Sequence, residues 1–171
     1  MPKLVREKQS WRRFSVKAGA FLVILGMVAL FFTRFTIAFD PQDSRCLPDH
    51  WVYLIDKRDK HLEAGKPYAF LADGLEPVFT GQTQMLKVLK GVPGDTVEVD
   101  FLEQVTINGE LVAHGLPVAD ILEKPKAFFV GKGQLAENKY WFMGESEKSF
   151  DSRYWGTVTN EQIIGRAYPL F

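Results

Sequence analysis

The feature that most constrains this chain is an apolar run close to its N-terminus. Residues 18–32 read AGAFLVILGMVALFF without a polar side chain, and only three polar residues interrupt the apolar character from there to Phe39. About 20 residues of helix span the roughly 30 Å hydrocarbon core of a bilayer. The run therefore predicts one transmembrane anchor helix over residues 18–38, followed by a single folded domain over residues 39–171.

The charges around the run predict its orientation. Glu7 is the one acidic residue before the run, against a cluster of basic residues: Lys3, Arg6, Lys8, Arg12, Arg13 and Lys17. By the positive-inside rule residues 1–17 stay cytoplasmic and residues 39–171 are exported. In a bacterium this means a single-pass protein of the inner membrane, with its folded domain in the periplasm. A cleaved secretory signal is the competing interpretation, but the sequence TIAFDP that follows offers no small-x-small cleavage site. A buried helix of a soluble protein would show a polar stripe.

Composition narrows the function classes. The 21 Lys and Arg residues balance the 21 Asp and Glu residues, so no global positive field favours nucleic acid as a partner. The single cysteine, Cys46, excludes an intrachain disulfide. The three histidines lack the spacing of metal ligands, so we expect neither a metal nor another cofactor.

Beyond residue 40 the pattern predicts a mainly β domain. Asn108-Gly109 separates two alternating arms, which is a strong hairpin signal, and Pro93-Gly94-Asp95 is typical of a tight turn. Short runs rich in aromatic and β-branched residues predict further strands at 51–55, 68–71, 85–89 and 96–101. We expect antiparallel, coiled and partly open sheets. Residues 114–133 are expected to form an irregular or extended insertion, and residues 160–164 one turn of helix.

Three segments carry residues suited to catalysis: 43–48 (DSRCLP), 85–95 (MLKVLKGVPGD) and 144–156 (GESEKSFDSRYWG). The first offers a nucleophile, Ser44 or Cys46. No histidine is placed to act as its base, and a lysine can do so only when neutral; burial favours that state because it lowers the pKa of an ammonium. Lys87 lies among apolar residues and would point to the opposite strand face from Lys90, so one lysine can be buried while the other meets solvent. The same sequence is equally compatible with Lys87 and Lys90 both being ordinary surface lysines.

These segments resemble the sequence boxes of the signal peptidase I family. The second segment resembles the lysine box KRxxGxPGD, with Lys87 four residues before Gly91. The third resembles the last box, with SFDSRYWG fitting S-x-D-S-R-x-W/F-G without a gap, and IGRA at 164–167 is similar to the family's continuation. The boxes occur in the family's order, behind an anchor, which makes the resemblance specific.

The resemblance implies a peptidase with a nucleophile–lysine dyad. Its nucleophile would attack the scissile carbonyl in the leader peptide of an exported precursor, and Lys87 would take the proton and later activate water. By similarity Ser149 orients the Lys87 amine, while Asp151 and Arg153 form a charge pair that braces the loop. In the conjugative-transfer branch the aspartate at this place is regarded as important to catalysis, so Asp151 is a candidate site residue too.

The first segment departs from the family pattern. Signal peptidases have serine in S-M-x-P or S-x-P, whereas this chain has Cys46-Leu47-Pro48. Either Cys46 attacks and Ser44 stabilises the oxyanion, or Ser44 attacks and Cys46 fills space. We favour Cys46, because a thiol with a pKa near 8.5 is easier for a lysine to deprotonate than a hydroxyl. Leu47 and Pro48 are then expected to contact substrate, although Leu47 could equally well be a core residue. A third interpretation is that the chain is an inactive member of the family, but the intact second and third segments disfavour it.

A second departure lies at Gly144-Glu145-Ser146, where the family prefers Gly-Asp-Asn and the box is one residue longer, so residues 145–148 do not align one to one. The short exported domain and the S-x-P-like spacing resemble the conjugative-transfer, TraF-type branch, which matures pilin and related subunits. The implied partners are exported precursors, including prepilin, and the lipid bilayer. Substrate would lie as an extended strand along a sheet edge.

A hypothesis from another class is a non-catalytic bitopic scaffold for secretion or pilus assembly. The position of Lys87 separates the two hypotheses: a catalytic lysine is buried within reach of Cys46 or Ser44, whereas a lysine of a scaffold projects into water. A self-cleaving repressor with a Ser-Lys dyad is disfavoured by the anchor, because such proteins act in the cytoplasm.

Overall fold

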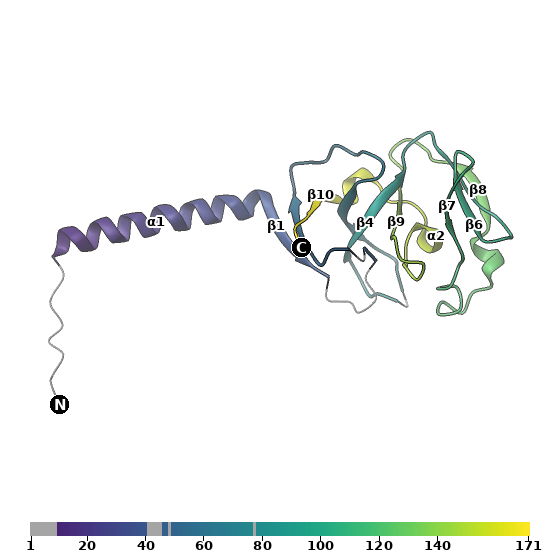
Figure 1. Cartoon of the computed structure of the whole chain (residues 1–171), viewed down its shortest axis with the longest axis horizontal. Helices are drawn as coiled ribbons and strands as arrows, with labels where there is room; N and C mark the ends of the chain where they lie inside the picture. The colour runs from purple at the N-terminus through teal and green to yellow at the C-terminus, as the bar shows by residue number, and fades with distance from the viewer. Residues whose placement is uncertain (1–9, 41–45, 48, 77) are drawn as a thin grey trace, which may run out of the picture. The chain divides into compact units, whose positions relative to one another are not determined.

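The computed structural model describes residues 10–40, 46–47, 49–76 and 78–171. It divides into two units, residues 1–35 and 36–171, which are described separately. The first unit contains α1 (Trp11–Arg34), one continuous helix (Figure 1). None of its side chains is buried. Its 24 residues extend about 36 Å at about 1.5 Å per residue. By length and composition α1 can cross a membrane.

The limits of this helix differ from the predicted span of 18–38. The helix begins at Trp11 and ends at Arg34, and the next residues form the strand β1 (Phe35–Phe39). The sequence FTIAF is rich in aromatic and β-branched residues, which favour a strand. The backbone of β1 forms its hydrogen bonds with β2, whereas the backbone of a continued helix would bond within the helix. An apolar run alone therefore does not locate the end of the helix.

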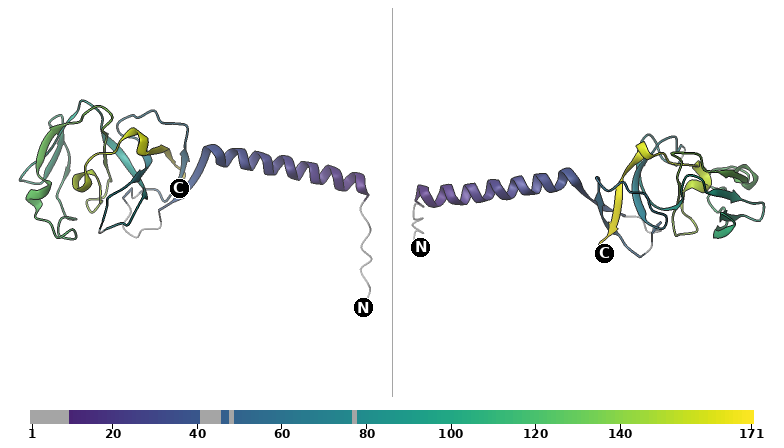
Figure 2. Two further views of the ribbon diagram at one scale, coloured as in Figure 1. Left: turned by 180° about the vertical axis from the view of Figure 1, so that it is seen from behind. Right: turned by 90° about the horizontal axis from the view of Figure 1, so that it is seen from above.

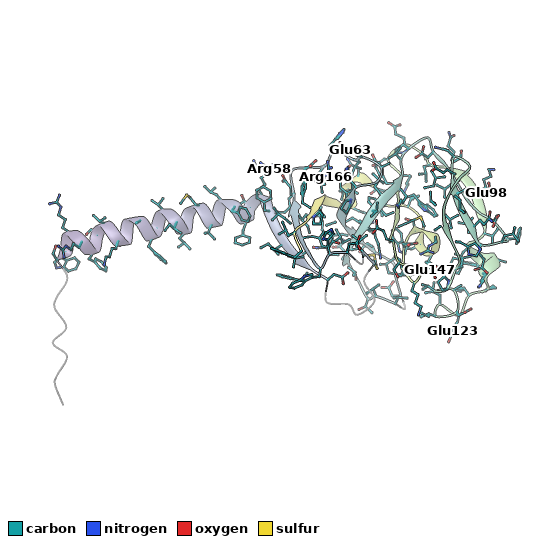
Figure 3. All side chains as sticks on the ribbon, viewed as in Figure 1. Arg58, Glu63, Glu98, Glu123, Glu147 and Arg166 are labelled. Carbon is teal, nitrogen blue, oxygen red and sulfur yellow. The ribbon has the colours of Figure 1, made fainter. Side chains whose placement is uncertain are left out.

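The second unit is built on a six-stranded sheet in the order β1-β2-β10-β3-β4-β9. β10 runs antiparallel to β2 and β3, and β4 runs antiparallel to β3 and β9. The strands after β1 are β2 (Val52–Asp56), β3 (Pro67–Ala72), β4 (Thr83–Gly91), β9 (Trp141–Met143) and β10 (Ile163–Pro169). The yellow strand β10 inserts between β2 and β3 and leads to the C-terminus (Figure 2). Arg166 of β10 lies 3.7 Å from the Glu63 carboxylate, and both are labelled in Figure 3.

A four-stranded sheet in the order β7-β6-β5-β8 completes the domain. Its strands are β5 (Thr96–Val99), β6 (Gln104–Ile107), β7 (Glu110–His114) and β8 (Gly131–Gln134). Asn108 and Gly109 have φ values of 53° and 83°, as a two-residue hairpin turn requires. Gly94, with φ 94°, turns the chain from β4 into β5. Both predicted turns are confirmed.

In the described part of the domain there are also three short helical segments: η1 (Lys126–Phe129), α2 (Ser152–Trp155) and η2 (Asn160–Gln162). The helical turn predicted at 160–164 corresponds to η2. The region 114–133, expected to be irregular or extended, holds the short helical segment η1 and the start of the strand β8. The mainly antiparallel β fold behind one apolar N-terminal helix is confirmed.

Both faces of the larger sheet are covered by apolar side chains. Tyr68 and Phe70 of β3 pack in one cluster with Leu89 and Phe142, whereas Ala69 packs in another with Ile55. A strand covered on both faces needs apolar residues at nearly every position. This accounts for the apolar residues Met85, Leu86, Val88 and Leu89 in the middle of β4, among which Lys87 is the polar exception.

Candidate active site

The central residue of the site is Lys87 in β4. Its side chain is 4% exposed and shares a strand face with Met85 and Leu89. The Lys87 amine (Nζ) lies 2.6 Å from Cys46 Sγ and donates a 2.9 Å hydrogen bond to Ser149 Oγ. Among the residues that the structure describes, no carboxylate lies within ion-pair distance of this amine. A buried amine is thus held between a thiol and a hydroxyl.

Ser149 reaches Lys87 through the loop between β9 and α2. Its side chain is 1% exposed, and its backbone N–H donates a 3.0 Å hydrogen bond to the Ser146 carbonyl. Arg153 Nη2 donates a 3.1 Å bond to the Ser149 carbonyl. The hydroxyl that accepts from Lys87 is therefore fixed by contacts on both sides of its own backbone.

The loop is braced by a buried ion pair between Asp151 and Arg153. Arg153 donates from Nε to Asp151 Oδ1 at 2.8 Å and from Nη2 to Asp151 Oδ2 at 2.9 Å, a two-pronged contact. The same Nη2 donates at 3.3 Å to the carbonyl of Glu147, a residue labelled in Figure 3. Burial opposes the charge of Arg153, but the hydrogen bond and charge of Asp151 outweigh it and raise the pKa of the guanidinium. The pair acts on Lys87 indirectly, through the position of Ser149.

Backbone hydrogen bonds tie Cys46 to the same loop. The Cys46 carbonyl accepts from the N–H groups of Glu145 and Ser146, at 2.8 and 3.3 Å. Backbone amides make this contact, so it does not depend on which side chains stand at 145 and 146. This gives a physical reason why Gly-Glu-Ser can replace the expected Gly-Asp-Asn here.

Gly144 lets the two segments approach closely. A Cβ placed on Gly144 would collide with the Ser149 hydroxyl and lie 2.6 Å from Ser149 Cβ and 3.1 Å from the Cys46 carbonyl oxygen. The Gly144 N–H donates to Asp151 Oδ2 at 3.1 Å. Only a residue without a side chain fits between the serine and the cysteine.

A groove of about 440 Å³ gives access to the site. Cys46, Lys87 and Phe150 line it together with Lys148 and with the first part of β4. The other lining residues are Ala38, Phe39, Asp40, Tyr53, Val78, Phe79, Thr83, Gln84, Met85 and Leu86. Cys46 is partly exposed, so its sulfur is open to molecules that enter the groove.

One edge of β4 is open along this groove. β9 pairs with β4 only from Val88 to Gly91, so residues 83–86 lack a strand neighbour on that side among the residues described. Leu89 bonds toward β3, because its N–H donates to the Lys66 carbonyl and its own carbonyl accepts from Gly65. With the two-residue period of a strand, the peptide groups of Leu86 and Gln84 face the open edge.

The predicted site residues fall into three groups. Cys46, Lys87 and Ser149 lie in direct contact, and Asp151 and Arg153 lie behind them. Ser44 and Pro48 lie outside the described residues. Leu47, for which substrate contact and a core position were both open, is 6% exposed and packs in the core beside Tyr53, Ile55, Ala69, Val88 and Ala167. An apolar side chain next to a buried sheet face gains more from the core than from an open groove.

Some contributors were not assigned a role from the sequence. Ser152 Oγ accepts from the Phe142 N–H at 2.9 Å and so fixes α2 to β9. Arg153 Nη1 donates to the Gly115 carbonyl at 3.1 Å, which ties the loop to the segment after β7. Ser152 and Gly144 lie within the third sequence box, but their residue types alone do not indicate these contacts.

Comparison with known proteins identifies the family. Residues 11–171 match the family model described as signal peptidase, peptidase S26. The chain belongs to this family. A relative named "Probable signal peptidase I-2" from Synechocystis sp. is 32% identical over 87 residues, which cover 50% of this chain and 37% of the relative. Signal peptidase I of Leptolyngbya laminosa is 28% identical over 88 residues, covering 50% and 40%.

The chain thus spans no more than two fifths of the length of these curated relatives. A crystal structure of a signal peptidase I from Enterococcus faecalis V583 aligns with a TM-score of 0.39 at 24% identity. That alignment covers 63% of this chain and 97% of the other.

Proposed function

We propose that this signal peptidase family member is a membrane-anchored endopeptidase that cleaves leader peptides from exported precursors. The contact that carries the proposal is the 2.6 Å approach of the Lys87 amine to Cys46 Sγ, with Lys87 only 4% exposed. A scaffold protein has no use for a lysine buried against a thiol, since an amine without a carboxylate partner is costly to bury as an ammonium.

In the proposed reaction Cys46 Sγ attacks the scissile carbonyl carbon while Lys87 accepts the thiol proton. The tetrahedral intermediate collapses to a thioester, and the Lys87 ammonium gives its proton to the leaving amine. Lys87, neutral again, then takes a proton from water, which attacks the thioester and releases Cys46. The hydrogen bond to Ser149 Oγ keeps the amine directed at the sulfur throughout.

Substrate is proposed to bind as an extended strand on the open edge of β4. The outward peptide groups of Gln84 and Leu86 would pair with its backbone, and the groove would take its side chains. Gln84→Pro tests this, because it removes a donor on the open edge without touching a bond to β3. We expect a KM raised by about tenfold for the loss of one such hydrogen bond. The matched control, Gln84→Ala, keeps the donor and should keep the KM.

We further propose the bacterial inner membrane as the location, with α1 as the anchor, residues 1–17 in the cytoplasm and the β domain in the periplasm. The positive charges before and within the start of α1 support this orientation. Protease added to sealed spheroplasts should digest the β domain; full protection of that domain would reverse the orientation.

Prepilin or another conjugative-transfer subunit is the proposed substrate, on the strength of the Cys46-Leu47-Pro48 spacing and the TraF-type resemblance. Incubating the full chain in detergent with a prepilin and with an unrelated secretory precursor distinguishes the two roles. Faster cleavage of the secretory precursor would favour general secretion.

The decisive experiment measures leader-peptide cleavage by Lys87→Met beside Lys90→Met. Lys90 is on the same strand but points to the other face, so its variant controls for loss of a charge on β4. Removing the general base should lower the rate by at least about 10³-fold, whereas Lys90→Met should retain it. An active Lys87→Met would remove the dyad mechanism.

The nucleophile is assigned by separate alanine substitutions of Cys46 and Ser44, combined with alkylation of the thiol. If Cys46 attacks, Cys46→Ala is inactive, Ser44→Ala is slowed, and iodoacetamide abolishes cleavage. If Ser44 attacks, Cys46→Ala remains active and resists the reagent.

A further inference from the structure

The contact between Lys87 and Cys46 also brings together two groups that can form a covalent bond under oxidation. Cys46 is partly exposed and lines the groove, so a small oxidant can reach its sulfur. Lys87, by contrast, is more than nine-tenths buried, has no carboxylate partner among the described residues, and directs its nitrogen at that sulfur. The pair therefore consists of an accessible thiol and an amine fixed against it.

We propose that peroxide converts this pair into a sulfenamide crosslink, making Cys46 and Lys87 a reversible modification site. In the first step the thiol is oxidised by two electrons to a sulfenic acid, while the peroxide is reduced to water. In the second step the neutral Lys87 amine attacks the sulfur, the S–O bond breaks, and an N–S bond forms with release of a second water. Oxygen and electrons balance, and the chain loses two hydrogen atoms.

Geometry favours this product over further oxidation. The nitrogen is already in contact with the sulfur, and its hydrogen bond to Ser149 Oγ holds it there. An oriented neighbour reacts as if it were present at very high concentration, so it outcompetes a second peroxide molecule from solution. Lys148 lines the same groove but is exposed and is not held by such a bond, which makes it the natural comparison.

The crosslink would consume both groups of the proposed dyad and would be opened by thiols. A thiol attacks the sulfur, releases the Lys87 amine as a mixed disulfide forms, and a second thiol regenerates Cys46. Oxidation would thus hold the site in an inactive form in which the Cys46 sulfur is protected from further oxidation to sulfinic acid. The chemistry needs no substrate, so it does not rest on the proposed peptidase activity.

The test treats the full chain in detergent with hydrogen peroxide and follows its intact mass. We expect a product about 2 Da lighter than the reduced chain, in which tandem mass spectrometry joins the peptides that contain Cys46 and Lys87. Dithiothreitol should restore the original mass. Lys148→Met should give the same product, whereas Lys87→Met should gain about 32 Da as its thiol proceeds to sulfinic acid.

Three results would overturn the inference: oxidation of the unsubstituted chain directly to sulfinic acid, a crosslink that maps to Lys148, or equal rates of sulfinic acid formation with and without Lys87. The mapping is done on the unsubstituted chain, so it remains decisive if Lys87→Met fails to fold. Cleavage without a crosslink would refute this inference alone, and a crosslink without cleavage would refute the proposed function alone.

Discussion

Gly144→Ala should inactivate the site without touching any reacting group. The added Cβ would lie 2.6 Å from Ser149 Cβ, whereas carbon atoms pack at about 3.5–4.0 Å, so Ser149 has to retreat by about 1 Å. The 2.9 Å hydrogen bond from the Lys87 amine to Ser149 Oγ would stretch to about 3.9 Å, beyond hydrogen-bonding range. Lys87 would then lose the contact that directs it at Cys46.

The expected loss follows from these displacements. Overpacking a buried contact costs about 1–3 kcal/mol of stability, and a 1 Å misplacement in an active site costs about 10²-fold in rate. Urea unfolding and leader-peptide cleavage measure the two effects. Gly133→Ala is the matched control, because a Cβ there meets nothing within 4 Å.

A second substitution tests the stated cause. Ser149→Gly removes the atoms with which the new Cβ collides, so adding Gly144→Ala to that background should cost little further stability. Unchanged stability and cleavage in Gly144→Ala alone would refute the close-approach argument. A full stability loss in the double variant would show that the collision lies elsewhere.

Three further outcomes are expected. Asp151→Ala leaves the buried Arg153 guanidinium uncompensated and should cost about 3–5 kcal/mol in urea unfolding, whereas Asp73→Ala should be nearly neutral; equal effects would contradict the bracing role. The hydrogen bond from Lys126 lowers the pKa of Glu103. The ionised Glu103 carboxylate therefore stabilises the fold above the usual carboxyl pKa of 4.5, and this stabilisation is lost as pH falls through the lower pKa of the folded state. Lys126→Met should weaken this acid dependence of the free energy of unfolding, and an unchanged pH profile would contradict the prediction. Burial raises the pKa of Tyr154, and the pKa values of Tyr68 and Tyr168 are raised too. Spectrophotometric titration should therefore show phenols that ionise above the ordinary value of 10, one of which is lost in Tyr154→Phe; an unchanged late-titrating signal in that variant would contradict the burial of Tyr154.

The local parts of the fold were predictable because their causes are local. Asn108-Gly109 and Pro93-Gly94-Asp95 determine turns through the backbone angles that their own residues allow, and the flanking strands follow. The sheet order was not predictable, because β10 pairs with β2 and β3 across more than 90 residues. The end of α1 was misplaced for a similar reason: Phe35 to Phe39 are apolar enough for a membrane helix, and pairing with β2 decides for a strand.

The candidate site shows the same division. Resemblance pointed to Lys87 and Ser149, because their side chains are the chemical groups that the motif encodes. The contact that ties Cys46 to the third box runs instead through the amides of Glu145 and Ser146, which every residue except proline supplies. The sequence leaves Leu47 open, because a leucine fits a substrate groove and a core equally well, and its burial against the covered face of the sheet favours the core.

Because Cys46 stands where the family has serine, its contact with Lys87 can serve both proton transfer and oxidative crosslinking, whereas a hydroxyl could serve only proton transfer. The same short distance lets the amine take a proton from sulfur and, after oxidation, trap that sulfur in a covalent bond. Serine has no sulfenic acid state, so Cys46→Ser should abolish the crosslink while leaving Lys87 beside a nucleophile that it can still deprotonate. Cleavage that is slower in Cys46→Ser but resistant to peroxide would therefore assign both properties to one contact, because no other described residue supplies a thiol.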